Sequence, residues 1–288
     1  MSTAIHRYWM SKTPEIKNLC IGQLILPGTH DSGSDKEASS VVNFIQATQD
    51  VSPLSQMNQG IRALDLRVSF HSEYSPGEGK RFQLFHLFPT GRTVSRDIIS
   101  AALEFFQWPQ TQQEIIVLDF HQFKDFTSDA HEELQSLLLK RLSDRIIPIS
   151  LSTLTVGELW EKHPGKNIVI AYNDNRRNLP CWFGVEQRWI GRNLPTTAEL
   201  KDYMDGTINS RKYLYDLVSI QCAKYVLPLH AADDFTDKID LWFKSEDENS
   251  YIQNFHIINT DWTTRSQLVE HCRHANKIRA AIIQKQTT

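Results

Sequence analysis

The sequence predicts an α/β fold, with a closed barrel of parallel strands as the first choice. Segments rich in β-branched and aromatic residues alternate with helix-sized segments, which is typical of βα units. Polar residues follow several of these segments, as they do at the carboxyl ends of barrel strands. A chain of 288 residues, 40% of them hydrophobic, is long enough for one such barrel, which takes about 250 residues. An open doubly wound sheet is the alternative, although no glycine-rich phosphate loop favours it.

Eight strands and five helices account for the alternation. Strands are predicted at residues 21–26, 63–69, 82–88, 115–120, 168–172, 217–226 and 255–260, with an eighth near 185–190. Helices are predicted at residues 95–108, 128–144, 196–203 and 266–283, with a short one beginning at 155. The helix over 128–144 has the clearest pattern, because Leu134, Leu138 and Leu142 recur at helical spacing behind a capping Ser128.

Two candidate site residues lie in a glycine-flanked turn. His30 and Asp31 belong to the sequence LPGTHDSG at residues 26–33, which follows an apolar run. A histidine exchanges a proton near neutral pH, so a barrel strand that ends here can present a catalytic base. Asp261 follows the last predicted strand in the same way, where it either joins a site or caps the following turn.

Other polar groups belong to the strands between these two. Asp65 and Arg67 alternate with apolar residues and share one face, as a site pair or as a buried structural ion pair. His86 comes near the end of an aromatic strand, just before turn residues. Asp119 and His121 also share a face, which suits either a substrate contact or a polar layer inside the barrel.

Composition and patterning argue against several classes of protein. A formal net charge of −3 gives no general attraction to nucleic acid, so no nucleic-acid partner is expected. The four cysteines are too far apart to suggest a zinc site or a disulfide framework. No apolar leader and no run of ~20 apolar residues is present, so neither a signal peptide nor a transmembrane segment is expected. Without a linker or repeat, we expect one catalytic domain over 1–288, with an extension (1–20) before the barrel (21–288).

The motifs resemble the phosphatidylinositol-specific phospholipase C (PI-PLC) X domain, especially the compact X-domain-only proteins. The resemblance covers about residues 24–283 and rests on PGTHDSG at 27–33, QGIR at 59–62, DLR at 65–67, the strand ending in His86, EIIVLDFHQF at 114–123 and IINTD at 257–261. It implies a single-domain, distorted TIM-type (βα) barrel. It also implies an inositol-phospholipid phosphodiesterase that releases diacylglycerol and a cyclic inositol phosphate.

The resemblance further implies how the base and the phosphate are handled. His30 would be the general base that takes the proton of the inositol 2-hydroxyl, and Asp261 would orient it. Arg67 would bind the non-bridging phosphate oxygens, and Asp65 would hold Arg67 in place.

The leaving group and the headgroup have their own expected contacts. His86, assisted by Asp31, would protonate the diacylglycerol oxygen as it leaves. Asp119 and His121 would contact the substrate, at a point where secreted bacterial enzymes have a lysine.

The expected metal requirement depends on Arg67. The resemblance implies that its guanidinium stands where calcium-dependent relatives hold their ion, so no metal and no other cofactor is expected. A calcium ion held by Asp31, Asp65 and Asp119 is the alternative.

An inositol phospholipid, met peripherally at a membrane surface, is the expected partner. The aromatic pairs Trp182–Phe183 and Trp242–Phe243 either contact the membrane or pack in the core. The expected location is cytoplasmic or peripheral to a membrane, although an injected bacterial effector would look the same. Two other functions fit the motifs less well: a noncatalytic inositol-lipid binding module, and a phosphodiesterase for a different glycerophosphodiester, whose usual Glu-x-Asp metal motif is missing here.

Overall fold

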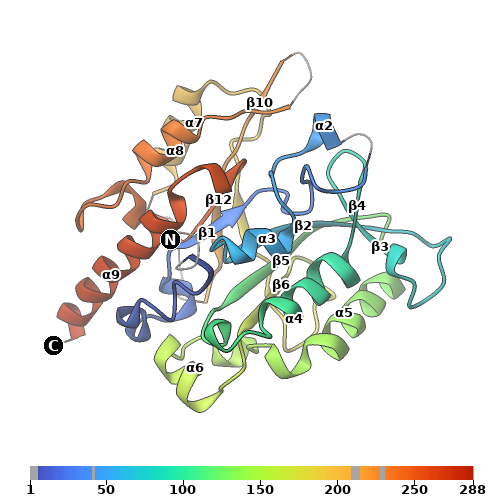
Figure 1. Cartoon of the computed structure of the whole chain (residues 1–288), viewed down its shortest axis with the longest axis horizontal. Coiled ribbons are helices and arrows are strands. Elements are labelled where there is room, and N and C mark those ends of the chain that lie inside the picture. Colours follow the sequence, from blue (N-terminus) through green and yellow to red (C-terminus); the bar gives the residue numbers. More distant parts are fainter. Residues whose placement is uncertain (1–5, 41–42, 209–214, 228–230, 288) are drawn as a thin grey trace.

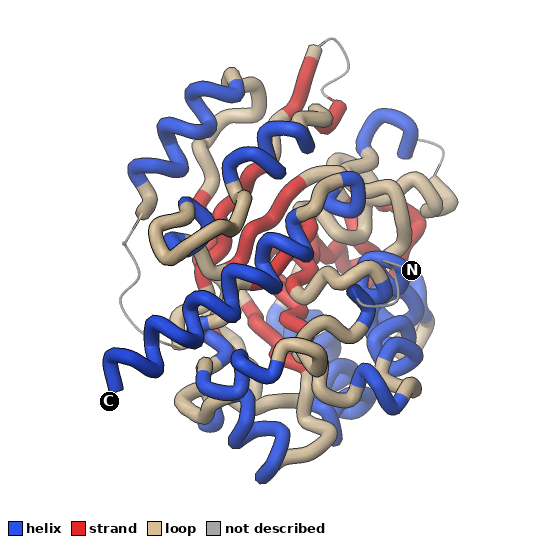
Figure 2. Tube along the Cα trace, turned by 60° about the vertical axis from the view of Figure 1, so that its left-hand side comes forward, coloured by secondary structure: helices blue, strands red, loops and turns tan. Residues whose placement is uncertain are grey.

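The computed structural model describes residues 6–40, 43–208, 215–227 and 231–287, so residues 1–5 of the expected N-terminal extension lie outside it. Within these residues, eight parallel strands form the centre of the molecule, and helices surround them (Figure 1, Figure 2). In spatial order the strands are β7 (Trp182–Phe183), β6 (Ile168–Tyr172), β5 (Ile116–Lys124), β2 (Ala63–Phe70), β1 (Leu26–Thr29), β12 (Ile257–Thr260), β9 (Val218–Cys222) and β8 (Glu186–Arg188).

The two ends of this sheet meet. Strands β7 and β8 are consecutive in the chain and only Gly184 and Val185 separate them, although they lie at opposite ends of the spatial order. Their described residues form no backbone pairing with each other, so hydrogen bonds do not close the sheet all the way round. The predicted distorted (βα) barrel is therefore confirmed, and the open doubly wound sheet is not formed.

Helices pack on the outside of the barrel. The α-helices are α2 (Asn43–Gln46), α3 (Pro53–Asn58), α4 (Ala101–Phe105), α5 (Ser128–Leu142), α6 (Val156–Lys162), α7 (Thr197–Gly206), α8 (Thr236–Trp242) and α9 (Leu268–Thr287). A π-helical segment, Val94–Ser100, precedes α4, and 3-10 turns cover Pro14–Asn18, Ile21–Gln23, Gly79–Arg81, Pro109–Thr111, Ser143–Arg145, Ile149–Leu151, Tyr251–Asn254 and Thr263–Arg265.

Local chemistry sets several of these helix starts. Thr155 and Thr196 begin α6 and α7 with capping boxes, in which the threonine and the glutamate three residues later satisfy each other's free backbone N–H groups. The cap of α5 is Thr127, whose hydroxyl accepts the N–H of Ala130. The predicted cap, Ser128, is instead the first residue of that helix.

The aromatic strand predicted at 82–88 forms, but it is not a barrel strand. It is β3 (Phe82–Phe85), which runs antiparallel to β2 and pairs with β4 (Pro89–Thr93). A parallel return needs a crossover of a dozen or more residues, usually a helix, and the link from Phe70 to Phe82 is too short for one. The eighth parallel strand is β7, which was not predicted. The first strand also begins later than predicted, because Ile21–Gln23 is a 3-10 turn.

A buried ion pair joins strands at the amino end of the barrel. Arg62 immediately precedes β2 and Glu114 lies two residues before β5; both are fully buried, and their closest atoms, Nη2 and Oε2, are 2.6 Å apart. Glu114 also accepts the backbone N–H groups of Met10 and Ser11, at 3.2 and 2.9 Å. The N-terminal segment is thereby fastened to the end of the barrel opposite the carboxyl ends of the strands.

Candidate active site

The carboxyl ends of the strands surround a cavity of about 590 Å³. Its wall includes four predicted site residues on different elements: His30 after β1, Arg67 on β2, His86 after β3 and His121 on β5. The rest of the lining is Leu87, Gln122, Gln187, Trp189, Asn193, Gln221, Ala223 and Tyr225. A cavity at this end of a parallel barrel, mostly apolar and with a few convergent polar groups, is the usual position of an active site.

His30 and Asp261 come together because β1 and β12 are neighbours that end at the same level. Thr29 lies opposite Thr260, so the next residue of each strand reaches the same place. Nδ1 of His30 lies 2.8 Å from Oδ1 of Asp261, and both residues are buried. The side-chain amide of Gln49 donates to the carbonyl oxygens of His30 and Thr260, at 2.9 Å each, which locks the two strand ends together.

Two opposing influences act on the pKa of His30. Burial lowers it, but the carboxylates of Asp261 and Asp31 outweigh burial and raise the pKa from 6.5 to about 9. Nη2 of Arg67 donates to Nε2 of His30 at 2.9 Å, which requires an Nε2 without a proton. The observed arrangement is therefore that of the base form, which predominates above a pH of about 9.

Asp31 is the carboxylate that holds Arg67. Its Oδ1 lies 2.7 Å from Nε of Arg67, and its φ of 45° is a left-handed conformation that aspartate tolerates. We expected Asp65 to hold Arg67, and that expectation is wrong. The pairing of β2 with β5 shifts register after Leu66, which places His121 as an extra residue on β5, and His121 is the partner of Asp65.

The same Asp31 stands between the two histidines. Its Oδ2 lies 3.5 Å from Nε2 of His30 and 3.4 Å from Nε2 of His86. His86 reaches this position because β3 packs closely against the turn after β1, where a β carbon on Gly33 would come within 2.3 Å of Leu84. The glycine in this turn therefore makes room for the hairpin that carries His86.

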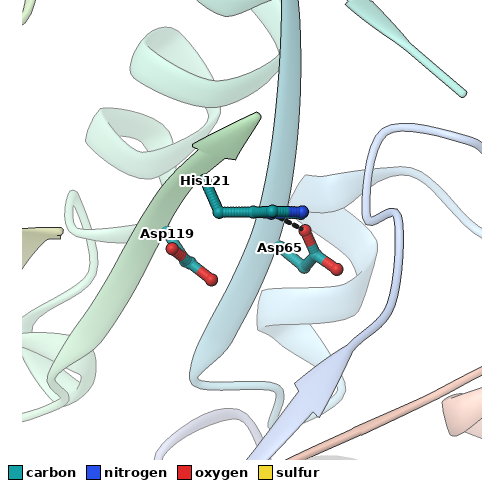
Figure 3. A group of neighbouring side chains, drawn as sticks. All are labelled: Asp65, Asp119 and His121. Carbon is teal, nitrogen blue, oxygen red and sulfur yellow. Dashed lines mark ion pairs between the residues drawn. The ribbon is translucent and has the colours of Figure 1, made fainter. Parts of the chain in front are cut away.

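A second polar group joins strands β2 and β5 and consists of two buried aspartates and a partly buried histidine (Figure 3). Asp65, Asp119 and His121 each offer a ligand atom within 4.8 Å of the others, and Nδ1 of His121 is 2.6 Å from Oδ1 of Asp65. Burial raises the pKa of Asp119 to about 8, helped by Asp65. Burial lowers the pKa of His121, but Asp65 and Asp119 raise it above its usual value overall.

The pKa shifts of Asp119 and His121 affect how well this group could hold a metal ion. The raised pKa of His121 favours its protonated form beside the Asp65 carboxylate, and the raised pKa of Asp119 favours its neutral form, which accepts a hydrogen bond from Gln187. Both directions reduce the negative charge that a cation would need here. Two carboxylates and an imidazole also form a mixed nitrogen and oxygen set, whereas calcium takes six to eight oxygens. Among the described residues, Asp31 does not join Asp65 and Asp119 in such a set, so the three-carboxylate calcium alternative is not assembled.

Several residues of the site were missed by the sequence prediction. Tyr225, on β10 (Tyr225–Val226, paired with β11, Ala231–Ala232), places its hydroxyl 2.8 Å from Nε2 of His86. Its position at the end of a predicted strand, like that of the other site residues, was a signal that could have indicated it. Gln187 and Gln221 were also missed, because amides give no motif that distinguishes a site from a surface.

The fold and the site define a barrel with two histidines, an arginine and aspartates at the carboxyl ends of its strands. No protein-family model matches the chain. It is 24% identical over 222 residues to human PI-PLC X domain-containing protein 1, a match that covers 67% of this chain and 65% of the human protein. Human PI-PLC X domain-containing protein 2 is 28% identical over 211 residues, with 65% of each chain covered. The matches thus span slightly less than two thirds of these relatives.

Solved structures agree on the fold. A phosphatidylinositol-specific phospholipase C from Listeria monocytogenes aligns with a TM-score of 0.67 at 16% identity, covering 96% of this chain and 98% of the bacterial one. The Staphylococcus aureus enzyme aligns with a TM-score of 0.70 at 14% identity, covering 96% and 99%. The resemblance to the PI-PLC X-domain family is confirmed: the chain is a relative of the X domain-containing proteins, with the barrel fold of the bacterial PI-PLCs.

Proposed function

We propose that this protein is a phosphatidylinositol phosphodiesterase of the phospholipase C type. It would cleave the bond between phosphate and glycerol oxygen in an inositol phospholipid and release diacylglycerol and a cyclic inositol phosphate. One observation carries the proposal: His30 and His86 present their Nε2 atoms to one carboxylate, Asp31, beside the guanidinium of Arg67 at the wall of a cavity.

The attack on phosphorus needs a base and a cation. In its base form, Nε2 of His30 removes the proton of the inositol 2-hydroxyl while the oxygen bonds to phosphorus, and Asp261 stabilises the resulting imidazolium. Arg67, which already reaches Nε2 of His30 and Oδ1 of Asp31, neutralises the charge that develops on the phosphate oxygens.

The departure of diacylglycerol needs an acid. The bond from phosphorus to the glycerol oxygen breaks as that oxygen receives the proton carried by His86. The carboxylate of Asp31 lies beside the imidazole that gives up this proton, with its Oδ2 3.4 Å from Nε2 of His86. One histidine gains a proton while the other loses one, so the charge of the site is unchanged by the reaction.

Asp65 and His121 support the reacting groups and the substrate. Asp65 accepts a hydrogen bond from the backbone N–H of Asp31 at 3.4 Å and pairs with His121 through its other oxygen. His121 therefore helps to fix the position of the turn that carries Asp31. His121 also lines the cavity, where it can contact the headgroup. We propose that the reaction requires no metal, since Arg67 supplies the positive charge at the phosphate.

Exposed apolar side chains at the mouth of the cavity suit contact with lipid. Leu87 and Phe88, beside His86, are 56% and 58% exposed, and Trp189 in the cavity wall is 48% exposed. The pairs considered from the sequence fit less well, because Trp182 and Phe243 are fully buried. None of the helices in the described residues is both long and apolar enough to cross a membrane.

A turnover assay tests the proposal. Phosphatidylinositol in mixed detergent micelles would be incubated with the protein, first with a chelator and then with calcium, and cyclic inositol phosphate measured. We expect release that survives the chelator and disappears in His30→Ala and Arg67→Ala. His163→Ala is the matched control, because His163 follows α6 at the other end of the barrel.

The other outcomes separate the alternatives. Release that requires calcium would contradict the role of Arg67. Lipid binding without turnover by the native protein would favour a noncatalytic binding module, and turnover of a soluble glycerophosphodiester alone would favour the second rival function.

A further inference from the structure

The hydroxyl of Tyr225 covers the atom through which His86 exchanges its proton. Nδ1 of His86 donates to the carbonyl oxygen of Gln46 at 2.9 Å, so that nitrogen keeps its hydrogen. Nε2 is then the nitrogen that gains and loses a proton, and Oη of Tyr225 lies 2.8 Å from it. A leaving oxygen that approaches along this direction meets the tyrosine hydroxyl before it meets the histidine.

Tyr225 is held firmly in this position. Its ring stacks on His86, with centroids 5.6 Å apart and planes 26° apart, and meets His30 edge-on at 6.4 Å. The ring also packs against the cluster of Ala47, Ala232 and Trp262. Burial raises the pKa of the phenol well above its usual range, so the hydroxyl keeps its proton at the pH of any assay.

We propose, on the basis of the function proposed above, that Tyr225 relays the proton from His86 to the leaving oxygen. As the bond between phosphorus and the glycerol oxygen breaks, Oη–H of Tyr225 is transferred to that oxygen and Nε2–H of His86 is transferred to Oη. The tyrosine ends unchanged, the imidazolium becomes imidazole and diacylglycerol leaves as an alcohol. A hydroxyl suits this position because it both donates and accepts.

If the hydroxyl of Tyr225 blocks His86 instead of relaying its proton, the opposite result is expected. If Tyr225 only blocked Nε2, the leaving oxygen would have to displace it, and removing the hydroxyl would leave turnover unchanged or increase it. If the hydroxyl relays the proton, its removal slows turnover wherever the leaving oxygen needs a proton.

Two substrates with different leaving groups distinguish these cases. Phosphatidylinositol releases an alkoxide, which needs a proton, whereas inositol 4-nitrophenyl phosphate releases a weakly basic phenolate that leaves without one. We expect Tyr225→Phe, which keeps the ring, to lower turnover of phosphatidylinositol about 100-fold, within the range for general acid catalysis, and to turn over the nitrophenyl ester at close to the native rate. His86→Ala should show the same dependence on the leaving group.

The control is Tyr172→Phe, which removes a hydroxyl bonded to His131 at 2.9 Å outside the site and should leave both rates near native. Retained turnover of the nitrophenyl ester also shows that Tyr225→Phe is folded. Equal losses on both substrates, or an unchanged or faster rate on phosphatidylinositol, would overturn the relay. Failure of the native protein on both substrates would instead refute the proposed function.

Discussion

Replacing Asp261 by asparagine should move the pH dependence of turnover. In the folded protein the carboxylates around His30 raise its pKa from 6.5 to about 9, despite burial, which is a rise of about 2.5 pH units. At roughly 1.4 kcal/mol per unit, the site favours the protonated imidazole by about 3.5 kcal/mol relative to water. Asp261 is the strongest charge responsible, with its Oδ1 2.8 Å from Nδ1.

The direction in which the pH dependence moves follows from the groups that still act on the pKa of His30 in the variant. The proposed base must be unprotonated, so kcat/KM of the native protein should rise with pH and level off above about 9. In Asp261→Asn, burial and Arg67 still lower the pKa and Asp31 still raises it, but the largest raising influence is lost, so the rise should occur at a lower pH. The plateau should fall by about 10²- to 10⁴-fold, because a base without its partner loses orientation and basicity.

Stability should change with the opposite dependence. A raised folded-state pKa contributes stability that is complete below the unfolded value of 6.5 and is lost as pH rises through about 9. The melting temperature of Asp261→Asn should therefore be furthest below that of the native protein near pH 6 and should approach it above pH 9. The measurements are kcat/KM from pH 5 to 10 and thermal melting over the same range, with the exposed Asp144→Asn as control. A rise in kcat/KM at the same pH in native protein and variant would refute the assignment of His30 as the base.

Four further changes test separate parts of the structure. Arg67→Lys should lower kcat by about 10²- to 10³-fold, because a single ammonium group cannot pair with Asp31 and bind the phosphate at the same time, as the planar guanidinium can. A near-native kcat would contradict the role of Arg67 in binding the phosphate. Glu114→Gln should cost roughly 3–5 kcal/mol in urea unfolding while leaving kcat of the folded protein intact, and a smaller loss would show that the buried pair contributes little. Phosphatidylinositol should be cleaved faster than its phosphorylated forms, because the extra phosphates need positive side chains and Arg67 is the one arginine or lysine that lines the cavity among the described residues. Faster cleavage of the phosphorylated forms would show that a positive side chain outside this lining binds the extra phosphates. Phe88→Ser should reduce sedimentation with phosphatidylinositol vesicles and spare hydrolysis of the soluble nitrophenyl ester, whereas unchanged sedimentation would place membrane contact on another surface.

The sequence predicted those parts of the site that depend only on where strands end. His30 and Asp261 each follow an apolar strand, and parallel strands that are neighbours bring such residues together. Strand β6 was predicted to the residue and the buried first half of β5 was also found, because continuous apolar runs are typical of a sheet covered on both faces. Strand β5 continues to Lys124, four residues beyond its predicted end, where partly buried and exposed residues alternate.

Parts of the site that depend on register and chain direction could not be predicted. Alternation places Asp65 and Arg67 on one face, but the bulge at His121 decides which cation pairs with Asp65. An aromatic run indicates a strand without indicating its direction, so the antiparallel course of the segment before His86 was not visible. Tyr225 does lie at the end of a predicted strand, but its contact with His86 depends on a two-residue strand and on the packing of its ring, neither of which leaves a periodic pattern.

The gap in backbone pairing between the described residues of β7 and β8 lies close to a residue that also lines the cavity, Gln187. Between β7 and β8, where described backbone groups do not pair, Gln187 of β8 spans the interior: its amide donates to Asp119 on β5, and its carbonyl oxygen accepts from Ser219 on β9 at 2.7 Å. These side-chain hydrogen bonds connect β8 to β5 across the interior of the barrel, in addition to the backbone pairing of β8 with β9. Gln187 also lines the cavity, so a longer or shorter residue at this position would change the room for a ligand. Such a change would leave the backbone pairing of every described strand in place, because only the side chain of Gln187 makes these contacts.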